Sequence, residues 1–157
     1  MKRYSFPMQV YLLNRRFKQH QQMVWSDKST IQDRTIYEDV IFAKMLWEDG
    51  LMEDLDFKTY VDLFKNMSNF LHRPDLIVYL DVEPDEALKR CRRRSRDCES
   101  TMTLEYLAKL KKGYEEWLKD IEPRIPVLRL DWNKFHDTKE VVKFVKMYLK
   151  GVKGSVI

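Results

Sequence analysis

The sequence predicts an α/β fold in which helices flank a parallel sheet. Two continuous apolar runs, LIVYLDV at 76–82 and VLRL at 127–130, are typical of strands buried in a parallel sheet. Segments with helical periodicity surround these runs, and strands that alternate with helices indicate parallel strands joined by helical crossovers. A chain of 157 residues has the size of one domain, so we expect a single domain over 1–157.

Local signals set the predicted elements. Pro7 is compatible with a helix only near its first turn, Gly50 is a plausible helix stop, and Pro84 suits the start of a helix. A short β-branched segment that ends at Asp33 predicts an additional strand. The predicted helices are 4–23, 36–48, 54–71, 84–93, 103–120 and 138–150, and the predicted strands are 29–32, 76–82 and 127–130.

The composition is that of a soluble globular protein, with 44% hydrophobic and 34% charged residues. No apolar run reaches the ~18 residues of a membrane-spanning helix, and the first residues lack the pattern of a signal peptide. The two cysteines, Cys91 and Cys98, are too few for a disulfide framework or a zinc site. We therefore expect free thiols, a cytoplasmic location and no membrane partner; a mitochondrial location stays open if a segment precedes Met1.

The net charge of +4 is unevenly distributed, because residues 89–96 (KRCRRRSR) carry six positive charges and the rest of the chain is net negative. One basic element argues against a broad nucleic-acid-binding face and favours a cluster aimed at a compact anion. Arg90 and Arg94 are four residues apart on one helix face, and Arg96 follows. Arginines bind two phosphate oxygens at once and neutralise charge on a transferring phosphoryl group. A solvated face or a targeting signal is the alternative.

Two further pairs could carry chemistry. Asp33 and Arg34 follow a predicted strand, where a carboxylate could accept a proton from a hydroxyl and an arginine could contact phosphate. The alternative is a surface ion pair at a helix start. Gln9 and Arg16 are two helical turns apart; the amide could pair with a base edge, and Arg16 could orient a carboxylate such as Asp39. The alternative is two solvated polar residues.

The order and spacing of these signals resemble the deoxynucleoside kinase family, and most closely the bacterial-type deoxyadenosine and deoxyguanosine kinases. The resemblance extends to about residue 130. It rests on four segments of the sequence, RYSFPMQVYLLNRRFKQ, IQDRTIYED, LIVYLDVEPDEALKRCRRRSR and LEYLAKLKKGYEEWL.

The resemblance implies a role for each candidate residue. Asp33 matches the general base that activates the sugar 5′-hydroxyl, and Arg34 matches an arginine that contacts the phosphates. The other implied binding residues are Gln9, Arg16 and Asp39 for the base, Glu99 near the sugar 3′-hydroxyl, Arg90, Arg94 and Arg96 in a lid over the phosphates, and the loop from Asp131 to Phe135 for the adenine of ATP.

The implied reaction transfers a phosphoryl group from ATP, with Mg²⁺, to the 5′-hydroxyl of a deoxynucleoside, preferably a purine, in nucleotide salvage. No residue is assigned as a metal ligand, and the resemblance implies a homodimer. One departure is large, because the four glycines (Gly50, Gly113, Gly151 and Gly154) form no G-x-x-x-x-G-K-[ST] phosphate loop. We therefore expect an incomplete sheet of the P-loop nucleoside kinase type, without its N-terminal strand and phosphate loop, and a truncated chain that is inactive alone.

Two other functions fit the sequence less fully. The chain could be a non-catalytic nucleoside-binding or dimerising subunit, which ATP binding would distinguish from an intact enzyme. It could also be an RNA-binding module that uses residues 89–96, although this run is not interleaved with aromatic residues. A salt-dependent affinity for nucleic acid would support that second alternative.

Overall fold

The computed structural model describes the backbone of residues 2–154, and the side chains of these residues other than Cys98 and 152–154. The chain forms two compact units, Met1–His72 and Arg73–Ile157. Each unit has its own set of packed elements, and the predicted site residues are divided between them.

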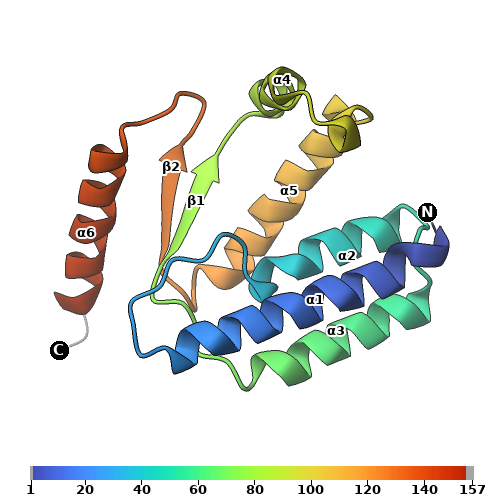
Figure 1. Ribbon diagram of the computed structural model, residues 1–157, viewed down its shortest axis with the longest axis horizontal. Helices are drawn as coiled ribbons and strands as arrows, with labels where there is room; N and C mark the ends of the chain where they lie inside the picture. The colour runs from blue at the N-terminus through green and yellow to red at the C-terminus, as the bar shows by residue number, and fades with distance from the viewer. Residues whose placement is uncertain (1, 155–157) are drawn as a thin grey trace. The chain divides into compact units, whose positions relative to one another are not determined.

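The first unit is built from three helices and one short 3₁₀ helix. The elements are α1 (Lys2–Trp25), η1 (Ile36–Glu38), α2 (Asp39–Glu48) and α3 (Asp54–Ser68), and Figure 1 shows the three α-helices side by side. Their shared core is formed by the buried side chains of Leu13, Ile36, Ala43, Met52 and Tyr60. Full burial of one large apolar side chain stabilises a fold by about 1.5–3 kcal/mol, so this core holds the three helices together.

Gly50 ends α2, as the sequence predicts. Its φ of +67° is the left-handed conformation that favours glycine. The amide of Gly50 donates to the carbonyl of Trp47 at 2.9 Å, and the amide of Leu51 donates to the carbonyl of Leu46 at 2.9 Å. These two bonds form a Schellman motif, which satisfies the last carbonyls of the helix and turns the chain toward α3.

The first helix begins earlier than the sequence predicts. Because α1 starts at Lys2, Pro7 lies inside the helix rather than in its first turn. A proline at this depth removes one backbone hydrogen bond and is normally costly. The side chains of Ser5, Gln9 and Leu13 are nevertheless buried around it, so packing of this face against the rest of the unit outweighs the local preference.

The prediction of a strand at 29–32 is wrong. These residues have no regular secondary structure, and the side chain of Ile31 is fully exposed. A strand is stabilised by hydrogen bonds to a neighbouring strand, and the pairing in the described part of the chain is confined to residues 77–81 and 127–131. β-branched composition alone does not supply a partner, so the segment remains an extended loop that bends at Asp33.

The second unit contains a two-stranded parallel sheet. Its elements are β1 (Ile77–Asp81), α4 (Pro84–Arg94), the short 3₁₀ helix η2 (Asp97–Glu99), α5 (Leu104–Ile121), β2 (Val127–Asp131) and α6 (Thr138–Gly154). Ile77 pairs with Val127 and Asp81 with Asp131, so both strands end at the same edge. The crossover from β1 to β2 passes through α4 and α5, which pack on one another. The strands and helices of this unit confirm the predicted α/β class.

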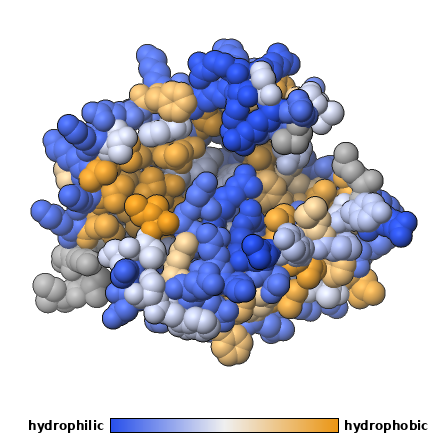
Figure 2. Space-filling model, in the orientation of Figure 1, coloured by the Kyte–Doolittle hydropathy of each residue, from blue (hydrophilic) through white to orange (hydrophobic). Residues whose placement is uncertain are grey.

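The prediction that β1 is buried on both faces is also wrong. Tyr79 faces α5 and stacks on Tyr114 at 5.9 Å between ring centroids, but Val78 and Leu80 on the opposite face remain 37% and 43% exposed. On β2, Arg129 is in register with Tyr79 and forms ion pairs with Glu115 of α5 and with Glu122 at its end. Figure 2 shows hydrophobic surface between α6 and the strands. A sheet of only two strands is covered mainly on one face here, so its apolar run does not become a fully buried layer.

Candidate functional site

The first unit holds a buried ion pair between α1 and α2. Arg16 and Asp39 are paired, and their side chains are 18% and 1% exposed. Asp39 is the first residue of α2, where a carboxylate is favoured by the helix dipole and by the free amides of the first turn. The structure therefore brings together the arginine and the carboxylate that the sequence places 23 residues apart.

Gln9 lies on α1 two turns before Arg16, and Gln9 is only 8% exposed. A buried amide has to find hydrogen-bonding partners, since an unpaired one costs stability. Tyr60 on α3 is fully buried nearby, within the electrostatic influence of Arg16. Burial raises the pKa of the Tyr60 hydroxyl and the charge of Arg16 opposes this, while the hydroxyl itself has no hydrogen-bond partner among the described residues. These polar groups form the interior of the first unit's site.

Asp33 and Arg34 do not follow a strand, so the prediction that they lie at the carboxyl end of a strand is wrong. Both side chains are exposed, and Arg34 has a φ of 61°, which is uncommon for a residue with a side chain. The guanidinium of Arg34 lies 4.8 Å from the centre of the Phe42 ring and 4.0 Å from the carboxylate of Glu38. Burial raises the pKa of Glu38, and the charge of Arg34 opposes this rise. The backbone bend therefore directs Arg34 back over α2.

In the second unit, Arg94 and Arg96 pair with Glu99. Arg94 makes two charge-assisted hydrogen bonds to its carboxylate, at 2.6 Å from Nη2 and 3.1 Å from Nε, and Arg96 lies 3.8 Å away. α4 ends at Ser95 in the left-handed conformation, with a φ of 50°, and this turn brings Glu99 back beside the helix. The side chains of Arg94 and Arg96 remain 49% and 62% exposed, so both can still meet an anion from solvent.

Arg90 is held in a different way. Its Nη2 donates to the backbone carbonyls of Trp132 at 2.7 Å and Asn133 at 2.9 Å, and its Nε donates to Glu86 at 2.9 Å. The guanidinium also lies 4.3 Å from the centre of the Phe135 ring. With 18% of its side chain exposed, Arg90 joins α4 to the loop after β2.

The loop that follows β2 is ordered by its own side chains. Asp131 accepts hydrogen bonds from the amide and the side chain of Asn133, and the backbone bond lowers the pKa of Asp131. His136 Nε2 lies 2.8 Å from the carbonyl oxygen of Asp131. This contact is the larger cause of the raised pKa of His136, and the contact with the Glu140 carboxylate is the next. Phe135 packs edge-on against Trp132. The two loop residues selected from the sequence, Asp131 and Phe135, thus belong to one folded turn.

Sequence reasoning missed several residues that organise these sites. Glu86 lies four residues before Arg90, and this spacing is typical of an ion pair on one helix face. Lys111 on α5 lies 3.1 Å from Asp81 and 2.6 Å from Glu83 at the carboxyl end of β1, a contact over a long sequence separation that no local pattern indicates. Tyr60 gave no signal either, because an aromatic residue in a helix is usually part of the core.

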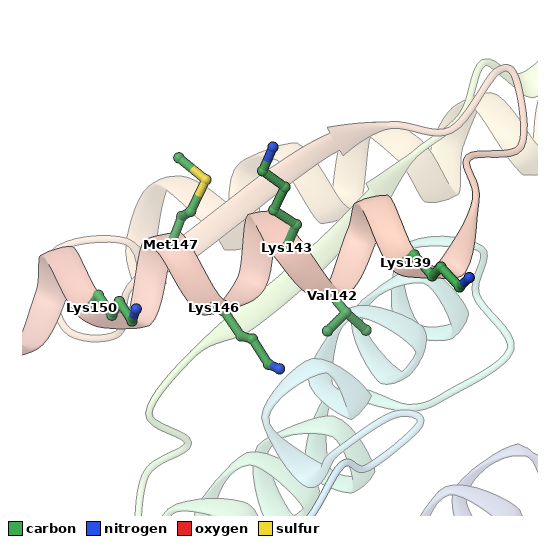
Figure 3. Close-up of a pocket in the computed structure, with 6 residues that line it drawn as sticks. All are labelled: Lys139, Val142, Lys143, Lys146, Met147 and Lys150. Carbon is green, nitrogen blue, oxygen red and sulfur yellow. The ribbon is translucent and has the colours of Figure 1, made fainter.

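A shallow hollow of about 350 Å³ lies on α6, apart from every predicted site residue. Figure 3 shows the side chains around it, which all come from this one helix: Lys139, Val142, Lys143, Lys146, Met147 and Lys150. Four lysines without a carboxylate or an aromatic ring cannot recognise the base or sugar of a nucleoside, so this hollow is not the candidate site.

Metal-binding clusters and membrane-spanning helices are both absent from the described residues. These residues contain no group of three or more His, Cys, Asp or Glu side chains placed to hold a metal ion. Over the same part of the chain, no helix combines the length and the hydropathy that crossing a membrane requires.

Comparisons with known proteins relate the chain to one family. The family model described as deoxynucleoside kinase matches residues 1–150. A deoxyadenosine kinase of Dictyostelium discoideum is 51% identical over 145 residues, which cover 92% of this chain and 59% of the relative. A deoxyadenosine/deoxycytidine kinase of Bacillus subtilis is 34% identical over 149 residues, covering 91% of this chain and 68% of the relative.

Solved structures show the same relationship. The deoxyadenosine kinase of M. mycoides with the products dCMP and a flexible dCDP bound superposes with a TM-score of 0.81 at 30% identity, over 96% of this chain and 76% of that one. The same kinase with bound dATP gives a TM-score of 0.77 at 31% identity, over 95% of this chain and 75% of that one. The chain thus spans about three fifths to three quarters of the length of these relatives. On the sequence match and the shared fold together, the chain belongs to the deoxynucleoside kinase family.

Proposed function

We propose that this chain supplies the nucleoside-binding and lid parts of a kinase that phosphorylates a deoxynucleoside at its 5′-hydroxyl, with ATP as the donor. The observation that carries the proposal is the buried Arg16–Asp39 pair, together with the buried Gln9 on the same helix as Arg16. Burial of two charges costs desolvation energy even when they are paired, and such buried charged groups occur preferentially at binding and catalytic sites. The names of the relatives, which are deoxynucleoside kinases, support the same reading.

In this proposal the base is recognised by three side chains of the first unit. Gln9 offers one acceptor and two donors, which suit the edge of a purine. Asp39 accepts a hydrogen bond from an amino group, and Arg16 supplies the counter-charge of that carboxylate and orients it. A deoxyadenosine-like substrate is favoured, because the relative with 51% identity is named a deoxyadenosine kinase.

The reacting groups are assigned around Asp33. In this assignment Asp33 accepts the proton of the 5′-hydroxyl while the oxygen attacks the terminal phosphorus of ATP, and ADP leaves on the opposite side. In the roles that the resemblance implies, Arg34 of the first unit is a phosphate contact, and Arg94 and Arg96 of the second unit are the arginines that offset charge on phosphoryl oxygens. For Glu99 the resemblance implies a contact with a sugar 3′-hydroxyl, and such a contact would replace the bond that its carboxylate makes to Arg94.

The phosphate donor is the least complete part of the assignment. These 157 residues contain no glycine-rich phosphate loop, and the described residues contain no carboxylate cluster for a metal. Mg²⁺ would therefore enter with the ATP phosphates, and no residue of this chain is assigned to it. We expect the 157-residue chain to show no phosphoryl transfer by itself, and we expect active forms to be homodimers located in the cytoplasm.

The test is phosphoryl transfer with and without a phosphate loop. The 157-residue chain and a chimera that carries the N-terminal segment of the Dictyostelium relative are incubated with Mg·ATP and deoxyadenosine, and the product is identified by mass and by its ³¹P signal. We expect 5′-monophosphate from the chimera and none from the chain alone. A chimera that folds, binds ATP and makes no 5′-monophosphate would refute the function. Micromolar Mg·ATP binding with turnover by the chain alone would refute the need for the loop.

A further inference from the structure

Arg90 differs from the other two lid arginines in what it contacts. Its donors face two backbone carbonyls and a carboxylate of the same unit, at 2.7, 2.9 and 2.9 Å. Its planar face lies 4.3 Å from the centre of the Phe135 ring. Arg94 and Arg96, in contrast, are half or more exposed and share the single carboxylate of Glu99.

The loop after β2 depends on this contact. Its carbonyls at Trp132 and Asn133 belong to irregular backbone, where no strand or helix supplies donors. Nη2 of Arg90 donates to both carbonyls, and Nε, which is fixed in the same rigid plane, donates to Glu86 on α4. The ring of Phe135 covers the face of the same group, so the arginine fixes the position of the loop's aromatic residue as well.

A second contact joins the same two segments. The side-chain oxygen of Asn133 accepts a hydrogen bond from the amide of Glu83, the residue that precedes α4, at 2.9 Å. The amide of Trp132 in turn donates to the carbonyl of Asp81 at the end of β1. α4 is therefore attached to the loop near both its start and its middle, and the end that carries Arg94 and Arg96 lies beyond these attachments.

We propose that Arg90 is a positioning residue that clamps the loop 131–136 to the helix α4, and that it does not act as a phosphate ligand. This inference rests on the proposed function, in which α4 carries phosphate-binding arginines, and on the contact with the adenine of ATP that the family resemblance implies for the loop. The clamp fixes the loop 131–136 against α4. The distance between the residues that contact the adenine and those that contact the phosphates is therefore set before ATP binds. Phosphate binding is left to Arg94 and Arg96, which have only to release Glu99.

Solution NMR on the chain labelled with ¹⁵N-arginine tests the clamp directly. A held guanidinium shows hindered rotation and resolved Nη protons, whereas an exposed one gives averaged signals. The probe is inorganic pyrophosphate, added to the wild-type chain up to millimolar concentration. We expect the Nε–H signals of Arg94 and Arg96 to shift, while the signal of Arg90 stays resolved and in place. An averaged Arg90 signal, or an Arg90 shift that follows that of Arg94, would overturn the proposal.

Matched lysine variants test the consequence for the loop. Lysine keeps the charge but lacks the planar fork, so Arg90→Lys should raise amide exchange at Glu83, Trp132 and Asn133 by about tenfold or more, the effect of losing charge-assisted bonds. Arg94→Lys, the control, should leave these amides within about twofold of wild type, since it contacts none of them. Equal effects of the two variants would overturn the clamp.

The two hypotheses fail in different ways. A pyrophosphate titration that moves none of the three arginine signals, with Arg90 still held, supports the clamp and counts against the phosphate-binding lid of the proposed function. The titration uses the unaltered chain, so it also decides the question if Arg90→Lys does not fold.

Discussion

Removal of the positive charge from the buried Arg16–Asp39 pair should destabilise the first unit strongly. Asp39 is 1% exposed, so Arg16→Met would leave a carboxylate that is removed from water and has lost its counter-charge. Breaking a buried ion pair by removing one partner costs about 3–5 kcal/mol. This is a large part of the ~5–15 kcal/mol of free energy that separates folded from unfolded domains.

The same helix offers a matched control. Lys2 pairs with Glu53 at 2.7 Å, but the two side chains are 62% and 66% exposed. Exposed ion pairs contribute about 0–1 kcal/mol, so Lys2→Met, with the same loss of charge and the same new side chain, should change the free energy of unfolding little. The difference between the two variants therefore isolates the effect of burial.

Urea unfolding at pH 7, followed by circular dichroism at 222 nm, measures both variants. We expect the transition midpoint of Arg16→Met to fall well below that of Lys2→Met without a change in slope. The double variant with Asp39→Leu should recover part of the loss, because it removes the uncompensated charge. Equal midpoints for the two single variants, or a double variant no more stable than Arg16→Met, would refute the reasoning.

Three further outcomes are expected. Gly50→Ala should lower the free energy of unfolding in urea by about 1–2 kcal/mol, because a φ of +67° strains a residue with a side chain. The control Gly151→Ala, in helix α6, should be neutral or stabilising by up to about 1 kcal/mol, and equal effects would contradict the turn geometry. The bond to the carbonyl of Asp131 raises the pKa of His136, so its stabilisation of the loop is full below the unfolded pKa of about 6.5 and is lost as the pH rises through the folded value. The protection factors of the loop amides, which are exchange rates relative to the intrinsic rates at the same pH, should be higher at pH 6 than at pH 8, and His136→Gln should make them equal at the two pH values. In the chimera described above, Asp33→Asn should lower kcat by about 10²–10⁴-fold and leave the KM for deoxyadenosine nearly unchanged, and near-normal turnover would remove Asp33 from the role of base.

The helices were predictable because their signals are local. Gly50 and Pro84 mark a helix end and a helix start in the structure, and the predicted spans agree with the observed ones within a few residues. The segment 29–32 was not predictable from its composition, because a strand depends on a partner elsewhere in the chain. The prediction that β1 is buried is wrong for the same reason, because the exposure of Val78 and Leu80 depends on which elements cover the sheet.

The candidate sites show the same limit. The spacing of Gln9 and Arg16 indicates one helix face, and the structure adds that this face is buried and that Arg16 meets Asp39. The arginine run predicts positive charge on α4, but not that Arg90 turns toward backbone carbonyls while Arg94 and Arg96 stay exposed. Those differences arise from the loop after β2, which lies about 40 residues further along the chain.

Titration calorimetry of the 157-residue chain with deoxyadenosine tests the central claim most directly. We expect saturable binding, and we expect Gln9→Ala to weaken it by about 1–3 kcal/mol because the variant leaves polar groups of the base unpaired. Gln19→Ala, an exposed glutamine on the same helix, is the control and should bind like the wild type. No saturable binding by the wild-type chain, or equal affinities for the two variants, would contradict the assignment of the first unit as the nucleoside site.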